Sequence, residues 1–88
     1  MKVRCCICGK PIKNKIRDAN NPDPLKDEQG HWLSQLPEGQ NVCCHECDMD
    51  YVTNYRINQF YGHPDVCIEI QNKVLELRKE WLNKDETN

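Results

Sequence analysis

The sequence predicts a small α+β domain in which a cysteine-rich centre holds short strands and helices together. The chain has 88 residues, of which 38% are hydrophobic and 30% charged. A domain of this size and composition buries a modest apolar core and often depends on a metal ion or a covalent cross-link. Six of the seven cysteines lie in two clusters, at residues 4–10 and 42–52. The last third of the chain shows the apolar periodicity of a helix.

The first segment, residues 2–17, is expected to form a short β-hairpin around the first cysteine cluster. Ile12 and Ile16 would then lie on one face of its second strand. Residues 18–30 are rich in Asn, Asp, Pro and Gly, which favour turns and oppose regular structure. We therefore expect a long loop there.

The next segment, residues 31–42, is expected to supply a strand around Trp32 and Leu33. A turn follows at residues 37–41, where the sequence reads PEGQN. Proline and glycine at these positions are typical of turns. The chain then returns into the second cysteine cluster.

A first helix is expected from Glu46 or Cys47 to Tyr61. Gly62 suits the left-handed residue that ends many helices, and Pro64 cannot continue a helix. The apolar periodicity of this helix is weak, and the sequence does not determine which of its sides is buried. One weakly amphipathic face consists of Met49, Val52, Arg56 and Phe60.

A second helix is expected over residues 66–82, with Asp65 as its N-cap. Its apolar face is wide, which is typical of a helix that packs against a larger body. The face can belong to the core of the same chain or to a contact with another protein, and the sequence leaves both alternatives open. Its central residues are Cys67, Ile70, Val74, Leu77 and Trp81.

The spacing of the cysteines predicts a metal site. Cys5 and Cys8 form one Cys-x-x-Cys pair, and Cys44 and Cys47 form the other. Two residues between thiolates allow both sulfurs of a tight turn, a zinc knuckle, to reach one ion. Two knuckles complete the tetrahedral shell of structural zinc. We therefore expect one structural Zn²⁺ bound by these four cysteines.

Other ligand sets remain open because the cysteines are doubled. Cys6 and Cys43 lie beside the expected ligands and could replace one of them. A redox dithiol or an iron–sulfur cluster is a further alternative. With the metal as the central feature, the chain divides into a zinc finger at residues 1–62, with a long internal loop at 18–30, and a C-terminal helix at 63–88, packed on the finger or on a partner.

Charge is distributed unevenly along the chain. Residues 1–17 carry six basic residues and no acid, which leaves six basic and fourteen acidic residues, a net −8, for the remainder. The N-terminus lacks the apolar segment of a secretory signal, and no stretch approaches the roughly 20 apolar residues of a membrane span. We expect a cytoplasmic protein without a membrane partner, in which reduced cysteines bind metal.

The order of knuckle, strands, second knuckle and helix resembles the treble-clef zinc finger over about residues 3–61. The motifs CCICGK, NNPDPLK and CCHEC are similar to small zinc-knuckle proteins of bacteriophages and bacteria. This resemblance implies a place in the host cytoplasm if the chain is phage-encoded. Some His-Asn-His nucleases are built on treble clefs, but the hairpin here offers only His31, and no His-His or His-Asn pair precedes the second knuckle. We expect no enzyme.

Two functions remain as hypotheses. The first is a non-enzymatic adapter or inhibitor that binds a protein partner, or forms a homodimer, through residues 66–82. The second is a nucleic-acid-binding regulator that uses the basic finger at residues 2–17, since phosphate contacts require clustered Lys and Arg. The residues expected at the protein contact are Ile70, Val74, Leu77 and Trp81, and those at the nucleic-acid contact are Lys10, Lys13, Lys15 and Arg17.

Overall fold

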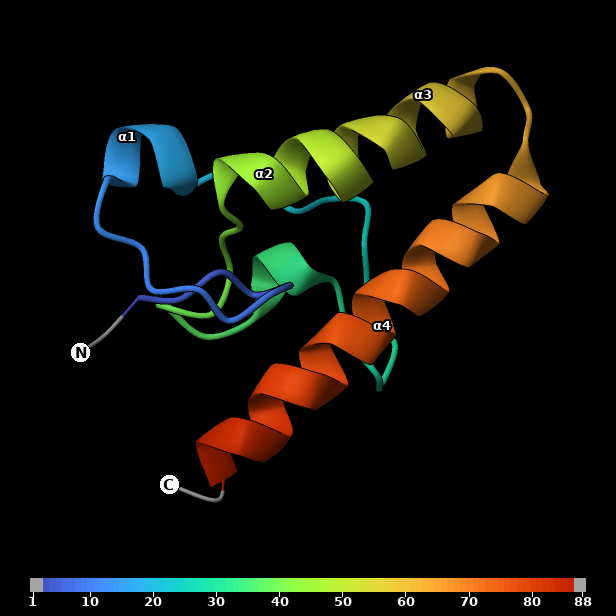
Figure 1. Ribbon diagram of the computed structural model, residues 1–88. Helices are drawn as coiled ribbons and strands as arrows, with labels where there is room; N and C mark the ends of the chain where they lie inside the picture. The colour runs from blue at the N-terminus through green and yellow to red at the C-terminus, as the bar shows by residue number, and fades with distance from the viewer. Residues whose placement is uncertain (1–2, 87–88) are drawn as a thin grey trace.

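The computed structural model describes residues 3–86. The two ends of the chain, residues 1–2 and 87–88, were included in the expected finger and C-terminal helix and lie outside the described residues. Figure 1 shows a helical run along one edge and a long helix that returns beneath it, with the N-terminal half between them. The elements are α1 (Lys15–Asp18), η1 (Leu33–Gln35), α2 (His45–Cys47), η2 (Asp48–Thr53), α3 (Asn54–Phe60) and α4 (Pro64–Glu86).

The expected strands are not confirmed. Within residues 3–86 the structure has isolated β-bridges, such as Arg4 with Pro11, but no named strand. A helical turn, α1, replaces the second strand of the hairpin because the side chain of Asn14 accepts hydrogen bonds from the first N–H groups of that turn. Ile12 is buried whereas Ile16 is 98% exposed, so the two do not share a face. The strand around Leu33 is replaced by the 3₁₀ turn η1.

The loop at residues 18–30 is fixed at both ends by hydrogen bonds. The backbones of Asn20 and Cys43 exchange two hydrogen bonds of 3.0 and 2.9 Å, which join the loop to the second cysteine cluster. The side-chain amide of Gln71 on α4 pairs with both backbone groups of Lys26, at 2.9 and 2.8 Å. Leu25 between them is fully buried. The loop therefore connects the second cluster to α4.

The first expected helix forms as a continuous run of α2, η2 and α3. It ends at Gly62, whose positive φ of 74° fits the predicted C′ position. The N–H groups of Gly62 and His63 close the end by bonding to the carbonyls of Gln59 and Asn58. The central part, η2, is a π-helix of six residues. Its wider turn shifts the side chains around the axis, so that Val52 is buried while Met49 is exposed.

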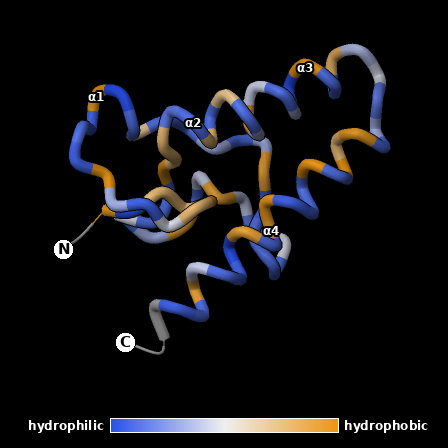
Figure 2. The backbone as a smooth tube through the Cα atoms, in the orientation of Figure 1, coloured by the Kyte–Doolittle hydropathy of each residue, from blue (hydrophilic) through white to orange (hydrophobic). Residues whose placement is uncertain are grey.

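The long helix α4 confirms the apolar periodicity of the C-terminal segment. It begins at Pro64 and not after an Asp65 N-cap, since proline fits the first helical position, where no N–H is needed. Apolar and polar residues alternate by turns along it (Figure 2). Val74 is fully buried and Ile70 nearly so, in one core with Ile7 and Leu33. No helix within residues 3–86 is both long and apolar enough to cross a membrane.

Arg78 joins α4 to the first cysteine cluster from within the core. Its side chain is 7% exposed, and one nitrogen donates a hydrogen bond to the backbone carbonyl of Cys6. The other nitrogens bind both carboxylate oxygens of Glu28, at 2.9 and 3.1 Å. One guanidinium thus connects the helix, the long loop and the first knuckle.

We expect Arg78→Ala to lower the free energy of unfolding by about 2–3 kcal/mol, because the buried carbonyl of Cys6 loses its donor and the apolar stem of the arginine is removed. Urea unfolding of the zinc-loaded protein measures this loss. Glu28→Gln is the matched control and should cost less than about 1 kcal/mol, since Glu28 is half exposed. Equal losses in the two variants would show that the ion pair, and not the carbonyl contact, stabilises the fold.

Candidate metal centre

Two turns bring the four predicted cysteines together. In the first turn, the N–H of Gly9 donates to the carbonyl of Cys5, at 2.9 Å, and Gly9 has a φ of 78°. An L side chain rarely adopts this angle, which explains the glycine directly after Cys8. In the second turn, Cys44 is the N-cap of α2 and Cys47 is its last residue. The second pair therefore lies at the start of the helical run.

The geometry of the sulfurs fits one tetrahedral ion. The Sγ atoms of Cys5, Cys8, Cys44 and Cys47 all lie within 4.8 Å of one another. Those of Cys8 and Cys44 are 3.9 Å apart. A zinc–sulfur bond of about 2.3 Å gives a tetrahedron with edges of about 3.8 Å, so these distances are compatible with zinc. Cys5, Cys44 and Cys47 are buried, and Cys8 is half-buried.

Hydrogen bonds polarise the sulfurs of this centre. The backbone N–H groups of Ile7 and Cys8 donate to Sγ of Cys5, at 3.4 and 3.5 Å. Hydrogen bonds from the side chains of Cys47 and Cys8 lower the pKa of Cys5 to about 2, and the contact with Cys5 raises the pKa of Cys47. The surroundings of Cys5 therefore stabilise its thiolate, and the thiols of Cys8 and Cys47 lie against it. A soft divalent cation that binds in such a group displaces the remaining thiol protons.

The structure separates the ligands from their cysteine neighbours. Cys6 and Cys43 are fully buried in the apolar core and do not belong to the group of four. Burial, followed by the negative charge of Cys5, raises the pKa of Cys6 to about 12. Burial also raises the pKa of Cys43 above its usual value. Both side chains are thus neutral thiols that pack as small apolar groups.

A carboxylate that the sequence analysis missed holds the second knuckle in place. Asp18, at the end of α1, accepts a hydrogen bond of 3.1 Å from the N–H of His45, the first residue of α2. Arg17 binds both oxygens of Asp18, at 3.1 and 2.8 Å, and so lowers the pKa of that carboxyl. Asp18 is therefore charged at neutral pH, which favours its position at a helix N-terminus. No local motif signals this contact across 27 residues.

Trp81 covers the first knuckle. A Cβ atom added at Gly9 would lie 2.5–2.7 Å from three atoms of the Trp81 side chain, so the indole packs directly against the glycine backbone. The indole Nε1 is buried, and within the described residues it has no hydrogen-bond partner. Trp81 therefore connects the end of α4 to the metal centre by packing alone.

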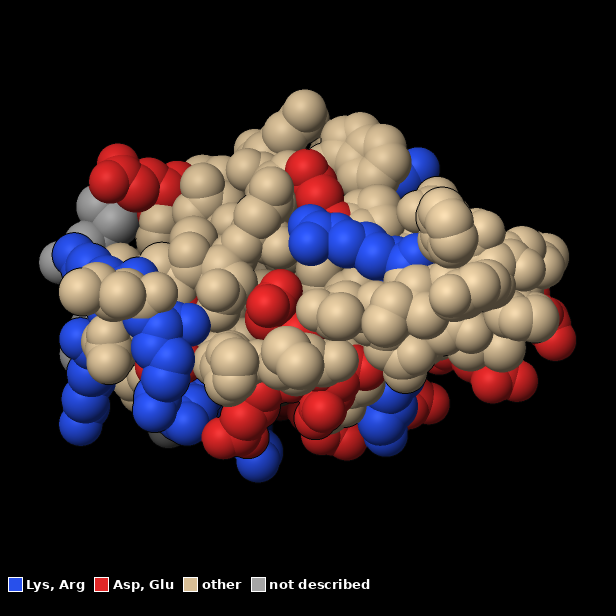
Figure 3. Space-filling view, turned by 90° about the horizontal axis from the view of Figure 1, so that it is seen from above, with Lys and Arg blue, Asp and Glu red and all other residues tan. Residues whose placement is uncertain are grey.

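Several of the other residues expected to bind a protein or a nucleic acid already have contacts within the chain. Ile70 and Val74 are buried in the core, and Leu77 packs against that core, so this face of α4 contacts the chain's own finger. Of the basic residues, Lys10 lies 3.8 Å from Glu46 and Arg17 binds Asp18. Lys13 and Lys15 are exposed and form no ion pair within residues 3–86. Figure 3 shows Lys and Arg side chains gathered at the end of the molecule where α1 lies.

Comparisons with known proteins find no relative. No protein-family model matches the chain, and neither the curated proteins nor the solved structures give a match. The comparisons therefore give no support to a relationship with zinc-knuckle proteins of bacteriophages or bacteria. The geometry itself shows a cluster of four cysteines, which is compatible with a zinc-stabilised module.

Proposed function

We propose that the chain is a non-enzymatic, zinc-stabilised protein-binding module, a small adapter or inhibitor. In this proposal the metal is a cross-link, and an exposed apolar surface on the helical run makes the contact. The observation that carries the proposal is this surface, the outer helical face, which consists of Met49, Ile57, Phe60 and Tyr61.

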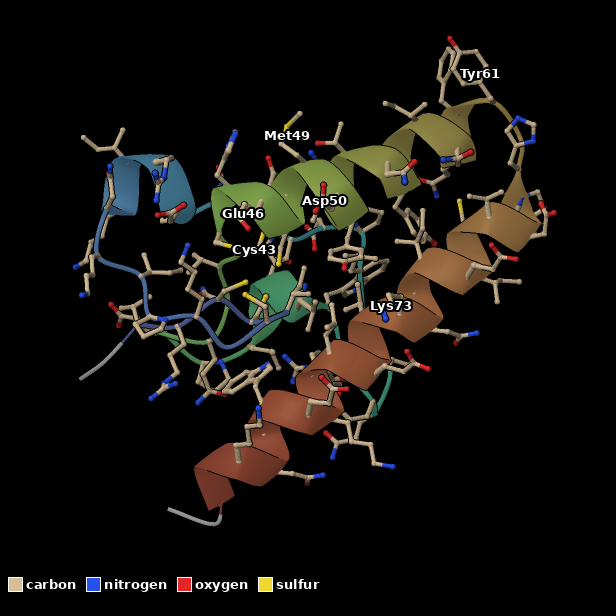
Figure 4. All side chains as sticks on the ribbon, in the orientation of Figure 1. Cys43, Glu46, Met49, Asp50, Tyr61 and Lys73 are labelled. Atoms are coloured by element: carbon tan, nitrogen blue, oxygen red, sulfur yellow. The ribbon has the colours of Figure 1, made fainter. Side chains whose placement is uncertain are left out.

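The outer helical face contains large side chains that are exposed and in contact with each other. Phe60 is 83% exposed, and the rings of Phe60 and Tyr61 pack edge to face with centroids 5.2 Å apart. Met49 and Tyr61 both project away from α4, on the side of the run opposite to the core (Figure 4). Apolar side chains grouped on a surface are typical of protein contacts. This face is free of α4, which packs on the other side of the run.

The chemistry of the metal centre supports a structural role. Four thiolates complete a tetrahedral shell and leave no position for water or substrate, whereas catalytic zinc keeps one open. His31, the one histidine that a hairpin nuclease could have used, is engaged in the long loop. Its backbone N–H donates to Oδ1 of Asp27 at 2.8 Å, and the Nδ1 of its ring lies 3.6 Å from Oδ2 of the same carboxylate.

We also propose that the centre is of the treble-clef kind. In that arrangement the last two of four ligands sit at a helix N-terminus, and Cys44 and Cys47 occupy this position on α2. The β-hairpin of a treble clef is reduced here to the bridge between Arg4 and Pro11. Two backbone hydrogen bonds flank this bridge, from the N–H of Cys5 to the carbonyl of Lys10 and from the N–H of Ile12 to the carbonyl of Val3, both at 2.9 Å.

Photo-crosslinking tests the proposed surface. A benzoylphenylalanine at Phe60, in cells that express the protein, is expected to give covalent adducts with protein. The same group at Lys73, on the exposed side of α4 (Figure 4), is the matched control and should give few. Adducts of equal yield at both positions, or none at Phe60 with zinc bound and the fold intact, would contradict protein binding through this face.

Nucleic-acid binding is the second candidate. A shallow hollow of about 280 Å³ is lined by Lys10, Lys13 and Arg17, and phosphate would find positive charge there. Two of these three residues already have acidic neighbours, Glu46 and Asp18, which weakens the local positive potential. The protein-binding proposal therefore has the stronger support.

A further inference from the structure

The face that carries the exposed apolar side chains has opposite charges at its two ends. At one end, residues 13–17 contain Lys13, Lys15 and Arg17 and no acid. At the other end, the turn between α3 and α4 is followed by Asp65 and Glu69, both exposed. Figure 3, which looks down on this face, shows the Lys and Arg cluster at the α1 end, with a carboxylate at one corner of that end, and carboxylates towards the opposite end and along one margin; one basic side chain and carboxylates also lie on the middle of the face. The outer helical face lies between them.

The basic end also presents an apolar side chain in a fixed position. Ile16 is 98% exposed on α1. The turn that carries it is held by the Asn14 cap and by Arg17, which binds the buried Asp18. The turn thus displays an isoleucine between a lysine, Lys15, and an arginine, Arg17. A surface that accepts it needs an apolar contact next to negative charge.

The chain itself offers such a surface, at the turn between α3 and α4. Phe60 and Tyr61 are exposed there, and Asp65 and Glu69 follow in the first turns of α4. We propose that a second copy of this chain binds here, with α1 of each copy against the α3–α4 turn of the other. This inference rests on the proposed function and names the partner of the same face.

A two-fold axis satisfies this arrangement. The axis lies in the plane of contact and runs across the middle of the helical run. A rotation of 180° about it places the basic end of one copy over the acidic end of the other, and the contact occurs twice. Met49 and Ile57, which lie along the helical run between the two ends, then face their counterparts near the centre. Opposite charges at the rim set the register and speed association, and the apolar centre supplies affinity. The described chain exposes 6025 Å², so a standard contact of roughly 800 Å² per partner would use less than one seventh of it.

Charge exchange tests the inference sharply. One variant carries Lys13→Glu and Lys15→Glu, which makes both ends acidic. The other carries Asp65→Lys and Glu69→Lys, which makes both ends basic. Each variant alone is expected to lose dimer affinity by at least about tenfold, because like charges then face each other twice. An equimolar mixture should restore the dimer, since every contact in the mixed pair joins opposite signs.

Native mass spectrometry and sedimentation of the zinc-loaded full chain provide the measurement. The wild type, of 10.4 kDa, should show a dimer that weakens with added salt. The control is Lys73→Glu with Lys79→Glu, on the exposed side of α4, and it should leave the dimer unchanged. Phe60→Ser should weaken the dimer, and mixing this variant with either charge variant should not restore dimer affinity.

The outcomes that overturn the inference are distinct from those that overturn the proposed function. A wild type that stays monomeric at several hundred micromolar, or a dimer that ignores both charge exchanges, overturns the second copy as partner. If the crosslinker at Phe60 then captures other proteins only, the protein-binding proposal stands without the dimer. If Lys13→Glu with Lys15→Glu abolishes binding of labelled RNA or DNA by a monomer, the basic end serves nucleic acid and the dimer is excluded.

Discussion

Replacing Cys47 by serine is expected to abolish stoichiometric zinc binding and, with it, cooperative folding. The three remaining thiolates cannot close the shell, and a serine hydroxyl is a poor zinc ligand at neutral pH. A structural zinc site contributes about 10–16 kcal/mol of apparent binding free energy, whereas whole domains are stable by about 5–15 kcal/mol. Native mass spectrometry should show one zinc in the wild type and none in Cys47→Ser. Circular dichroism should show a non-cooperative thermal transition for the variant.

The doubled cysteines provide matched controls for this experiment. Cys6→Ala and Cys43→Ala remove a thiol that is as buried as the ligands and adjacent to one of them. Both variants should retain one zinc and lose only about 1–2 kcal/mol of stability, from the small cavity left behind. Loss of zinc from either control would show that the ligand set is shuffled. Retention of zinc and of a sharp transition in Cys47→Ser would overturn the proposed cross-link.

Removal of the metal from the intact protein should have the same consequence. A strong chelator is expected to unfold the wild type and to raise the exposure of Trp81, which covers the first knuckle. Its fluorescence should shift to longer wavelength as the ring enters water. Added zinc should reverse the shift, whereas magnesium should not, because a four-sulfur shell excludes hard cations.

The grouping of the four cysteines was predictable from sequence because its signal is local. Two residues between the cysteines of each pair determine how the sulfurs can converge, whatever the rest of the chain does. The glycine after Cys8 and the glycine after Tyr61 were predictable for the same reason, since a left-handed residue is needed at a defined place. The buried stripe of α4 follows from a periodicity that continues over several turns.

The elements that could not be predicted depend on contacts between distant residues. The β-hairpin is not confirmed beyond the bridge between Arg4 and Pro11, because the side chain of Asn14 accepts hydrogen bonds from the first N–H groups of α1 and holds the backbone there in a helical turn. The face of the first helix could not be assigned because its periodicity is not constant. The π-helix η2 interrupts the 3.6-residue repeat, so Met49 and Val52 do not share a side.

The supports of the metal centre were missed for a related reason. Asp18 reaches His45 across 27 residues, and Arg78 reaches Cys6 across 72. Neither contact has a spacing rule, because only the folded chain brings the partners together. The sequence therefore predicts the four candidate ligands, whereas the structure shows what orients the two turns that carry them.

Gly9→Ala is expected to be the most destabilising substitution outside the four ligands. The φ of 78° costs an alanine about 1 kcal/mol or more. Its Cβ would in addition lie 2.5 Å from the Trp81 ring, which must move and uncover the knuckle. We expect a total loss of at least about 3 kcal/mol in urea unfolding of the zinc-loaded protein, with weaker zinc retention against a competing chelator.

Gly30→Ala separates the two causes, because Gly30 has a similar φ of 83° and nothing within 4 Å of an added Cβ. Gly30→Ala should lower the free energy of unfolding only by the cost of its positive φ, about 1 kcal/mol. Trp81→Ala combined with Gly9→Ala completes a double-mutant cycle. The double variant should lose less than the sum of the two single losses, since the ring that clashes is gone. If Gly9→Ala costs no more than Gly30→Ala, or if the losses are additive, Trp81 does not press on the knuckle. In that case the end of α4 makes no contribution to the metal centre.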